Sequence, residues 1–384
     1  GLMSSTLISN IGQLITNSDE NLGIINDAAL VIGNGKVLWV GENKLAPAAD
    51  NLIDAANGVV TPGFVDSHTH AIFAGDRSKD YVARMAGAKY ATGGIKTTVA
   101  ATRNATYGEL KNHTESVLRK CKSHGTTTVE IKSGYGLDIE SEVKILQVAQ
   151  SFTEESTFLG AHVIPAEFEN NRDGYVNLVK GEMLNAVLPH AKWIDVFCDQ
   201  GAFTVDEARE ILKTGIAKGL LGRIHGNQLG DSGGAELAIE LNLASVDHAT
   251  VVSEITIEAL ANSNVVTTFL PGAEFFTKSN YPNSKLFFEL GAKVALATDC
   301  NPGSSYLTSM PVVMSLAIRE MGFTPAQALY ATTMGGAAAL KRTDIGHLQV
   351  GANADLAIWD APSYEHITYR FGEIDCQVLS TGKF

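Results

Sequence analysis

The chain has 384 residues, 45% of them hydrophobic, and a formal net charge of −13. This size allows one large α/β domain and a small one, and the acidic charge argues against nucleic acid or an anionic membrane as a partner. Because no apolar run approaches the roughly 20 residues of a membrane span, no signal peptide is evident and the four cysteines are scattered, we expect a cytoplasmic protein that acts on a small molecule.

The two ends of the chain are predicted to form one small β-domain. Residues 4–58 contain short β-prone segments separated by turns, including the hairpin signal Asn34-Gly35. The segments 354–359 and 376–379 have the same character. We therefore expect a composite β-sandwich domain formed by residues 1–58 and 345–384.

Between the ends, strand-like and helix-like segments alternate, which is typical of repeated βα units. Thr204 with Glu207 forms a capping box at one helix start, and Pro325 follows Thr324 at another. Eight such units predict an α/β fold with a (β/α)8 TIM-like barrel over residues 59–344, whose active site lies at the C-terminal ends of the strands. Strands are predicted at 60–66, 126–131, 157–161, 193–198, 222–225, 244–247, 265–269 and 294–298.

Candidate catalytic histidines and an aspartate follow four of these predicted strands. His68 and His70 follow the first, and residues two apart on a strand point the same way. His225 follows the fifth strand, His248 the sixth and Asp299 the eighth. Since a barrel brings these ends to one face, His68, His70, His225 and Asp299 are predicted to bind one Zn2+ or similar divalent ion. Such an ion lowers the pKa of bound water toward about 7, and Asp299 can take up the released proton, so we expect hydrolysis.

This pattern resembles the amidohydrolase superfamily, whose members carry HxH after strand one, His after strands five and six, and Asp after strand eight. The resemblance spans nearly the full chain and implies a metal-dependent barrel. Members with two metals commonly bridge them with a carboxylated lysine after strand four, and residues 193–199 contain no lysine. We therefore expect one divalent metal per subunit, Zn2+ or Fe2+, with His248 oriented toward the reacting oxygen.

Four blocks resemble more narrowly the imidazolonepropionase family within that superfamily. The resemblance implies hydrolysis of the ring C–N amide bond of 4-imidazolone-5-propanoate to N-formimino-L-glutamate in histidine degradation, with hydroxide generated at the metal attacking the ring carbonyl. It also implies a homodimer, and the use of Tyr135 and His162 at the substrate, where both offer donors to the ring amide. The blocks are residues 68–77, 130–137, 160–165 and 297–305.

The propanoate of such a substrate needs a cation and hydrogen-bond donors. Arg77, shortly after His70, is a candidate for a bidentate clamp. Asn301 and the exposed backbone N–H groups around Gly303 and Ser304 are predicted to complete the carboxylate site. Arg84 and Arg103 are weaker rivals to Arg77.

One position departs from the commoner form of the family. Gln228 stands three residues after His225, where glutamate is usual. An amide can hydrogen-bond the substrate but cannot accept a proton at neutral pH. We therefore predict that Gln228 positions the ring and that proton transfer falls to Asp299 or His248.

Three other functions stay open. Related nucleobase deaminases use a glutamate at the position of Gln228 to carry a proton to the leaving ammonia, so the amide disfavours that reaction. A hydrolase of hydantoins or dihydropyrimidines is a closer rival, although most of these enzymes carry the lysine after strand four. A non-catalytic barrel scaffold fits the fold, but buried ionisable groups without a use are costly. The Gly-rich stretch 86–97 is the candidate lid over a small substrate.

Overall fold

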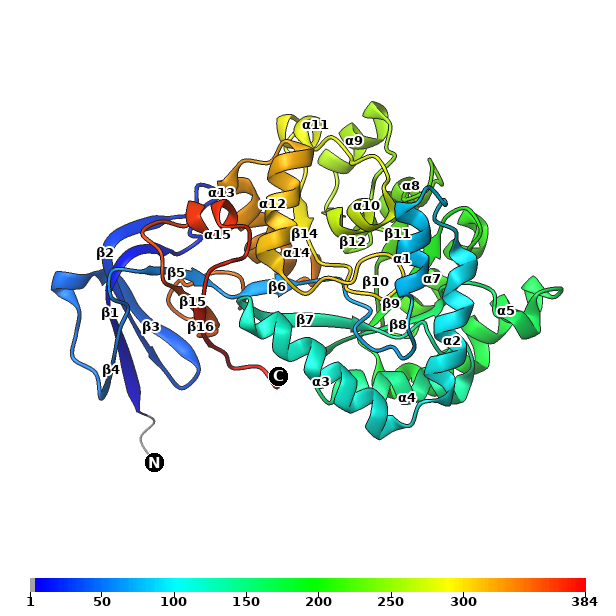
Figure 1. Cartoon of the computed structure of the whole chain (residues 1–384), viewed down its shortest axis with the longest axis horizontal. Helices are drawn as coiled ribbons and strands as arrows, with labels where there is room; N and C mark the ends of the chain where they lie inside the picture. Colours follow the sequence, from blue (N-terminus) through cyan, green and yellow to red (C-terminus); the bar gives the residue numbers. More distant parts are fainter. Residues whose placement is uncertain (1–3) are drawn as a thin grey trace.

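Parallel strands form a barrel in the computed structural model, which describes residues 4–384 (Figure 1). Neighbouring strands in space are also neighbours along the chain, apart from the short β10 (Leu221–Gly222), which pairs with β9. Each of the eight predicted positions contains a barrel strand, although the segments 60–66 and 222–225 each span two strands. Within the described residues the strands run in the order β6 (Phe64–Asp66), β7 (Thr126–Lys132), β8 (Glu155–Ala161), β9 (Trp193–Cys198), β11 (Ile224–Gly226), β12 (Ser245–His248), β13 (Val266–Phe269) and β14 (Val294–Leu296).

The first and last strands meet just beyond their C-terminal ends, at the mouth of the barrel. Thr69 and Cys300 form a parallel bridge there. The backbone N–H of Asp299 donates to the carbonyl of His68 at 3.0 Å, and that of His70 donates to the carbonyl of Cys300 at 2.8 Å. The closure of the barrel therefore ties together the two segments that carry three of the predicted metal ligands.

The helices pack around the barrel, and their ends follow the predicted capping signals (Figure 1). Reciprocal capping boxes join Thr204 to Glu207 and Thr324 to Gln327, with proline in the first turn of the second helix. The helices are α1 (Ser78–Met85), α2 (Ile95–Asn104), α3 (Tyr107–Ser123), α4 (Ile139–Gln150), α5 (Arg172–Leu178), α6 (Leu184–Val187), α7 (Val205–Ala217), α8 (Gly234–Glu240), α9 (Glu254–Ala261), α10 (Pro271–Thr277), α11 (Lys285–Glu289), α12 (Met310–Met321), α13 (Pro325–Tyr330), α14 (Gly336–Ala339) and α15 (Glu365–Tyr369).

Both chain ends enter one mixed sheet beside the barrel, shown in blue and red in Figure 1. The predicted hairpin at Asn34-Gly35 joins β2 to β3, with both turn residues at positive φ. The small β-domain from both ends is thus confirmed. Its boundaries with the barrel, between residues 58 and 59 and between residues 344 and 345, stay a prediction. Residues 1–3 lie outside the described residues. The strands are β1 (Ser5–Ile15), β2 (Ile24–Gly33), β3 (Lys36–Glu42), β4 (Asn51–Asp54), β5 (Val59–Pro62), β15 (Leu356–Trp359) and β16 (Cys376–Leu379).

The strand predicted at 60–66 is in fact two strands that belong to different sheets. β5 pairs with β1 and β15 in the small sheet, whereas β6 pairs with β7 in the barrel. The break lies at Gly63, where any Cβ would collide with the side chain of Thr127. Because both strands are fully buried, the apolar run shows no sign of the division between the two sheets.

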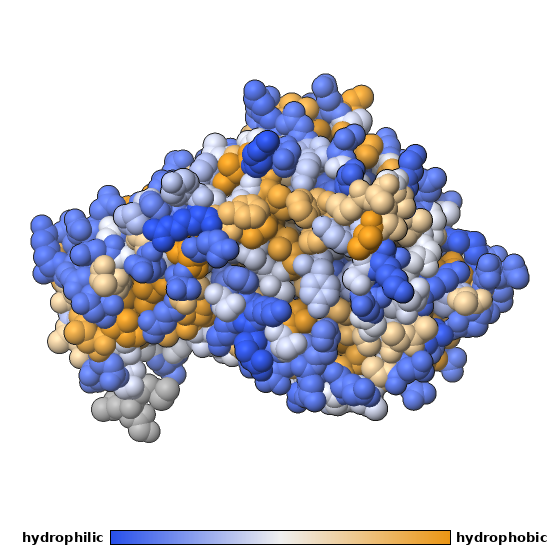
Figure 2. Space-filling model, viewed as in Figure 1, coloured by the Kyte–Doolittle hydropathy of each residue, from blue (hydrophilic) through white to orange (hydrophobic). Residues whose placement is uncertain are grey.

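Among residues 4–384, no helix is both long enough and apolar enough to cross a membrane. Figure 2 shows hydrophilic residues along most of the outline of the viewed face, with hydrophobic residues gathered in a band across its middle and on the small sheet.

Candidate functional site

Three imidazole nitrogens and one carboxylate oxygen converge at the mouth of the barrel. The Nε2 atoms of His68 and His70 are 3.2 Å apart, and those of His70 and His225 are 3.4 Å apart. Asp299 Oδ1 lies 3.1 Å from His68 Nε2 and 3.3 Å from His70 Nε2. Tetrahedral ligand atoms on bonds of about 2.0–2.1 Å are about 3.3–3.4 Å apart. Each of these four separations therefore fits a pair of neighbouring ligands around one divalent cation.

Carboxylates behind two of these histidines fix their tautomers. His68 Nδ1 donates to Asp247 Oδ2 at 2.6 Å, and His225 Nδ1 donates to Asp195 Oδ1 at 3.1 Å. Burial, reinforced by the charge of Lys132, lowers the pKa of His68 well below its usual range, so this ring is neutral. A neutral ring with its proton on Nδ1 has a bare Nε2, the atom that a metal ion binds.

His248 and Asp299 stand together on strained backbone. His248 Nε2 lies 3.9 Å from Asp299 Oδ2, and φ is 85° at His248 and 53° at Asp299. Positive φ is costly for residues other than glycine, and such strain concentrates at active sites. Burial raises the pKa of Asp299 to about 6 and lowers that of His248 to about 3, so the imidazole of His248 is neutral.

A pocket opens above these residues and gathers nearly all the predicted positions. Every predicted site residue lines it except His68, which lies beneath. Sequence reasoning missed three lining residues, Tyr90, Ile95 and Phe197; two of them belong to the glycine-rich stretch 86–97, whose contacts no motif revealed. The pocket is lined by His70, Arg77, Tyr90, Ile95, Tyr135, His162, Phe197, His225, Gln228, His248, Asp299, Asn301, Gly303 and Ser304.

At one end of the pocket, the structure gives Tyr135 and His162 different hydrogen-bonding roles. Burial raises the pKa of Tyr135 well above its usual range, so its hydroxyl remains a donor. His162 Nδ1 donates to the carbonyl of Gly134 at 2.7 Å. The neutral ring then offers Nε2 as an acceptor, whereas the sequence suggested a donor at this position.

The loop that carries Tyr135 is held by a buried carboxylate that the sequence did not reveal. Glu142 Oε2 accepts the backbone N–H of Gly134 at 3.0 Å and that of Gly136 at 3.1 Å. Glu142 Oε1 accepts the hydroxyl of Ser133 at 2.8 Å. The start of α4 therefore fixes the position of the tyrosine in the pocket.

At the other end lies Arg77, the predicted donor for a carboxylate. It is buried, forms an ion pair with Asp80 and donates from Nη1 to Thr98 Oγ1 at 3.2 Å. The expected backbone donors are already used, because Gly303 N and Ser304 N donate to Asn301 Oδ1 at 2.9 and 2.8 Å. This short turn orders the loop beside Arg77 instead of leaving its N–H groups free.

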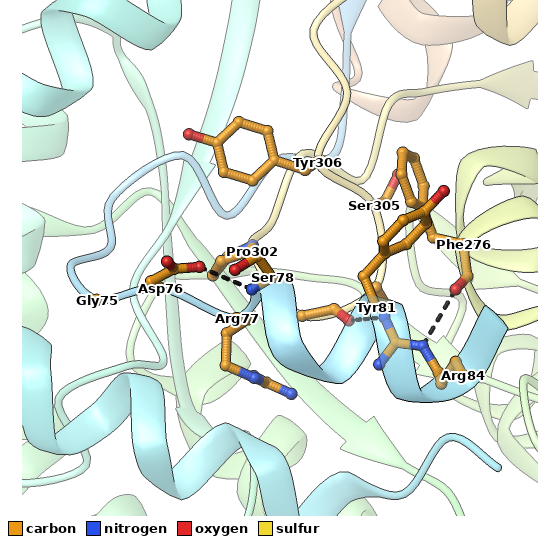
Figure 3. Close-up of a pocket in the computed structure, with 12 residues that line it drawn as sticks. Gly75, Asp76, Arg77, Ser78, Tyr81, Arg84, Phe276, Pro302, Ser305 and Tyr306 are labelled. Carbon is orange, nitrogen blue, oxygen red and sulfur yellow. Dashed lines mark hydrogen bonds between the residues drawn. The ribbon is translucent and has the colours of Figure 1, made fainter. Parts of the chain in front are cut away.

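A second pocket adjoins the first on the outer side of Arg77 (Figure 3). The two pockets share Arg77, Gly303 and Ser304. Arg84, at the other end of α1, donates from Nε to the carbonyl of Phe276 at 3.1 Å and from Nη2 to that of Gly303 at 2.5 Å. Arg103 is paired with Asp138 and Glu167. Of the three candidate arginines, only Arg77 lines the pocket above the histidines.

Glu274 on α10 is a buried carboxylate that does not line either pocket. Thr250 Oγ1 donates to its Oε1 at 2.6 Å, and its Oε2 has no partner within residues 4–384. Burial raises the pKa of Glu274 to about 7. An unfolded glutamate has a pKa of about 4.3, so the folded state binds the proton more tightly. This group therefore makes the protein less stable as pH rises from about 4.3 to about 7.

Replacing Glu274 by glutamine should remove this loss of stability. Relative to wild type, Glu274→Gln should gain up to about 3 kcal/mol of unfolding free energy between pH 5 and pH 8. Thermal unfolding at both pH values measures the difference, with Glu258→Gln, at an exposed position on α9, as the control that should show no such gain. An equal difference between Glu274→Gln and wild type at the two pH values would contradict the expectation.

Comparison with known proteins gives one consistent result. Residues 59–379 match the family described as the Amidohydrolase family. An imidazolonepropionase from Mycolicibacterium smegmatis is 52% identical over 374 residues, which cover 96% of this chain and 94% of that protein. One from Salinispora arenicola is 53% identical over 386 residues, which cover 99% of this chain and 98% of that protein.

Solved structures share the fold at low sequence identity. Guanine deaminase from C. acetobutylicum, with guanine bound, superimposes with a TM-score of 0.75 at 16% identity and covers 100% of both chains. An adenosine deaminase from Xanthomonas campestris with bound zinc has a TM-score of 0.70 at 16% identity, covering 97% of this chain and 91% of its own. These two structures support the barrel and its accompanying sheet.

Proposed function

The chain belongs to the imidazolonepropionase family of amidohydrolases, and from this premise we propose how its pocket carries out the reaction. The reaction is the metal-dependent hydrolysis of the ring C–N amide bond of 4-imidazolone-5-propanoate, which yields N-formimino-L-glutamate in histidine degradation. This assignment rests on identities of 52% and 53% to two imidazolonepropionases over nearly the full length of the chain. The observation that carries the mechanism is the close approach of His68, His70 and His225 to one another, with Asp299 beside His68 and His70, at a pocket that has Arg77 in its wall.

These four residues would hold one divalent cation, Zn2+ or Fe2+, since nitrogen and oxygen donors suit both. When bound, the cation lowers the pKa of a coordinated water and polarises the ring carbonyl. The Nε2 atoms of His68 and His225, left bare by the Nδ1 contacts to Asp247 and Asp195, both face His70 Nε2 and support this ligand set. Strand β9 presents Asp195 toward His225, and no lysine of that strand is available for a second metal.

Asp299 is the proposed proton carrier. It takes a proton from the attacking water as the new C–O bond forms at the ring carbonyl, and returns that proton to the ring nitrogen as the C–N bond breaks. His248 Nε2 lies 3.9 Å from Asp299 Oδ2. From this position the neutral imidazole donates a hydrogen bond to the oxygen of the ring carbonyl as that oxygen develops negative charge.

The remaining pocket residues orient the substrate at its two ends. The hydroxyl of Tyr135 donates to the ring, and His162 Nε2 accepts a ring N–H. Arg77 binds the propanoate. Ser304, whose hydroxyl donates to Asn301 Oδ1 at 3.2 Å, helps to order the loop beside it. This arrangement places the imidazolone ring over the histidines and the propanoate away from them. Because both ends of the substrate are held, the position of the scissile C–N bond is fixed.

Gln228 is proposed to position the ring without carrying a proton. Its backbone N–H donates to Asp199 Oδ2 at 2.7 Å, which anchors it at the pocket wall. Gln228→Glu should therefore leave the acidic limb of the kcat/KM pH profile where it is in wild type. Gln228→Met, which keeps the size and loses the hydrogen bonds, should lower kcat/KM about tenfold without moving that limb. A large displacement of the limb in Gln228→Glu would mean that this position takes part in proton transfer.

Product analysis separates this function from its rivals. With 4-imidazolone-5-propanoate, mass spectrometry should show a product one water heavier than the substrate, with no ammonia released in the same step. Stoichiometric ammonia would instead indicate deamination. A lack of product, together with turnover of hydantoin or dihydropyrimidine, would assign the pocket to another cyclic amide.

The expected assembly is a homodimer in the cytoplasm, as the family resemblance implies. Size-exclusion chromatography with light scattering measures the mass of the particle directly. A monomer at micromolar concentration would overturn this part of the proposal.

A further inference from the structure

Five charged side chains lie inside the barrel, beneath the predicted metal ligands. Glu130 and Lys132 come from β7, Asp195 from β9 and Asp247 from β12, while Arg223 lies between β10 and β11. None is more than 1% exposed. None of the five is among the described residues that line the pocket above the histidines. They are therefore out of reach of the substrate.

These residues form one continuous chain of contacts. Lys132 Nζ lies 2.8 Å from Asp195 Oδ2 and also pairs with Glu130. Arg223 Nη1 lies 3.2 Å from Glu130 Oε2, and its Nη2 lies 2.8 Å from Asp247 Oδ2. The two ends of the chain, Asp195 and Asp247, are the carboxylates that hold the Nδ1 atoms of His225 and His68. Two metal histidines from different strands are thus joined through five buried charges.

The contacts at each end constrain the carboxylates. Asp247 Oδ2 accepts from both Arg223 and His68, so the guanidinium fixes the oxygen that holds His68. Asp195 divides its oxygens, with Oδ2 on Lys132 and Oδ1 on His225. Without the cations, each carboxylate would lose the contact that fixes its rotation and would be a buried charge with too few partners.

Such an arrangement is costly for stability. A buried ion network is often no more stabilising than apolar side chains of the same volume, because desolvation offsets the attraction between the charges. Three carboxylates and two cations are kept here in the position where His68 and His225 need acceptors of defined orientation. Because apolar side chains of the same volume would stabilise the barrel as well, stability alone does not require these charges. The cost of burying them therefore points to a role at the metal site.

We propose that Glu130, Lys132, Asp195, Arg223 and Asp247 act as one charge clamp that fixes the orientation and proton position of His68 and His225. Metal affinity then depends on Lys132 and Arg223, although their contacts run to carboxylates and not to the metal histidines. The inference rests on the proposed metal ligands. It assigns Lys132 and Arg223 as positioning residues and makes the metal site sensitive to charges on strands that supply no ligand.

Metal affinity of the full-length protein tests this clamp directly. Lys132→Gln should bind Zn2+ at least about tenfold more weakly than wild type in competition with a chromophoric chelator, the size of effect that lost outer contacts have at metal sites. The Co2+-substituted protein should also show a changed visible spectrum, because the imidazoles are no longer held in place. Neither readout requires turnover.

A control and a milder variant separate the clamp from general damage to the barrel. Glu155, on β8, is a buried carboxylate that pairs with Lys192 and accepts from Trp193 Nε1 at 2.8 Å. Glu155→Gln should change Zn2+ affinity less than about twofold. Thr157 Oγ1 donates to Glu130 Oε2 at 2.7 Å, and the near-isosteric Thr157→Val should weaken Zn2+ binding about two- to fivefold.

The outcomes distinguish this inference from the proposed function. If Lys132→Gln folds, as judged by circular dichroism, and binds Zn2+ as tightly as wild type, the clamp is overturned. If Lys132→Gln does not fold, Thr157→Val decides, and wild-type affinity in that variant overturns the clamp. A wild-type protein that binds no stoichiometric Zn2+ or Co2+ would instead contradict the proposed ligand set.

Discussion

Asp299→Asn should lower kcat for 4-imidazolone-5-propanoate by at least about 10³-fold, the largest effect we expect from a single substitution. The amide keeps the shape of the side chain but cannot take up a proton, and general base catalysis alone is worth about 10²–10⁴-fold. It also removes a negative ligand that lies 3.1 Å from His68 Nε2. Steady-state rates, normalised to the metal content of each preparation, separate the two losses.

A buried aspartate elsewhere provides the control for Asp299→Asn. Asp355 is buried in the small β-domain, where it accepts from Thr381. Asp355→Asn should keep wild-type kcat even if it lowers the unfolding temperature. Asp299→Asn protein that contains a full complement of metal and retains more than a tenth of wild-type kcat would rule out Asp299 as the proton carrier.

Arg77→Gln should raise KM about 30- to 150-fold with a smaller change in kcat. A hydrogen bond to a charged group is worth about 2–3 kcal/mol when its partner is left buried, and the propanoate is bound alike in the ground and transition states. Steady-state kinetics measures KM and kcat separately. An imidazolone without the propanoate should react equally well with wild type and Arg77→Gln, because the lost contact is then absent from both.

Arg103 offers a matched control for Arg77. It was a rival candidate from the sequence, yet its guanidinium pairs with Asp138 and Glu167 and donates from Nε to the carbonyl of Gly136, and none of these three residues lines the pocket. Arg103→Gln should leave KM within about twofold of wild type. A large rise in KM for Arg103→Gln, or none for Arg77→Gln, would place the propanoate elsewhere.

The sequence predicts the barrel and the metal ligands because both depend on local patterns. Buried parallel strands are apolar runs, and ligands that follow strand ends must meet at one face once the barrel closes. The convergence of His68, His70, His225 and Asp299 could therefore be predicted without any knowledge of contacts. The same local logic misses the boundary at Gly63, since the strands on both sides of it are equally buried.

The parts that could not be predicted depend on pairing between distant residues. The tautomer of His162 is fixed by the carbonyl of Gly134, and the N–H groups of Gly303 and Ser304 are taken by Asn301. In the sequence, Lys132 looks like any charged residue at a strand end. Only the fold shows that it reaches Asp195 across the barrel interior.

The most direct test of the account is the decay of imidazolone ultraviolet absorbance when metal-quantified protein is added to fresh 4-imidazolone-5-propanoate, corrected for spontaneous loss. We expect rapid decay that scales with about one equivalent of Zn2+ or Fe2+ per chain, stops when a chelator removes the metal and resumes when the metal is restored. Absence of decay in protein that carries its full complement of metal would contradict the assignment of this pocket to imidazolone ring opening.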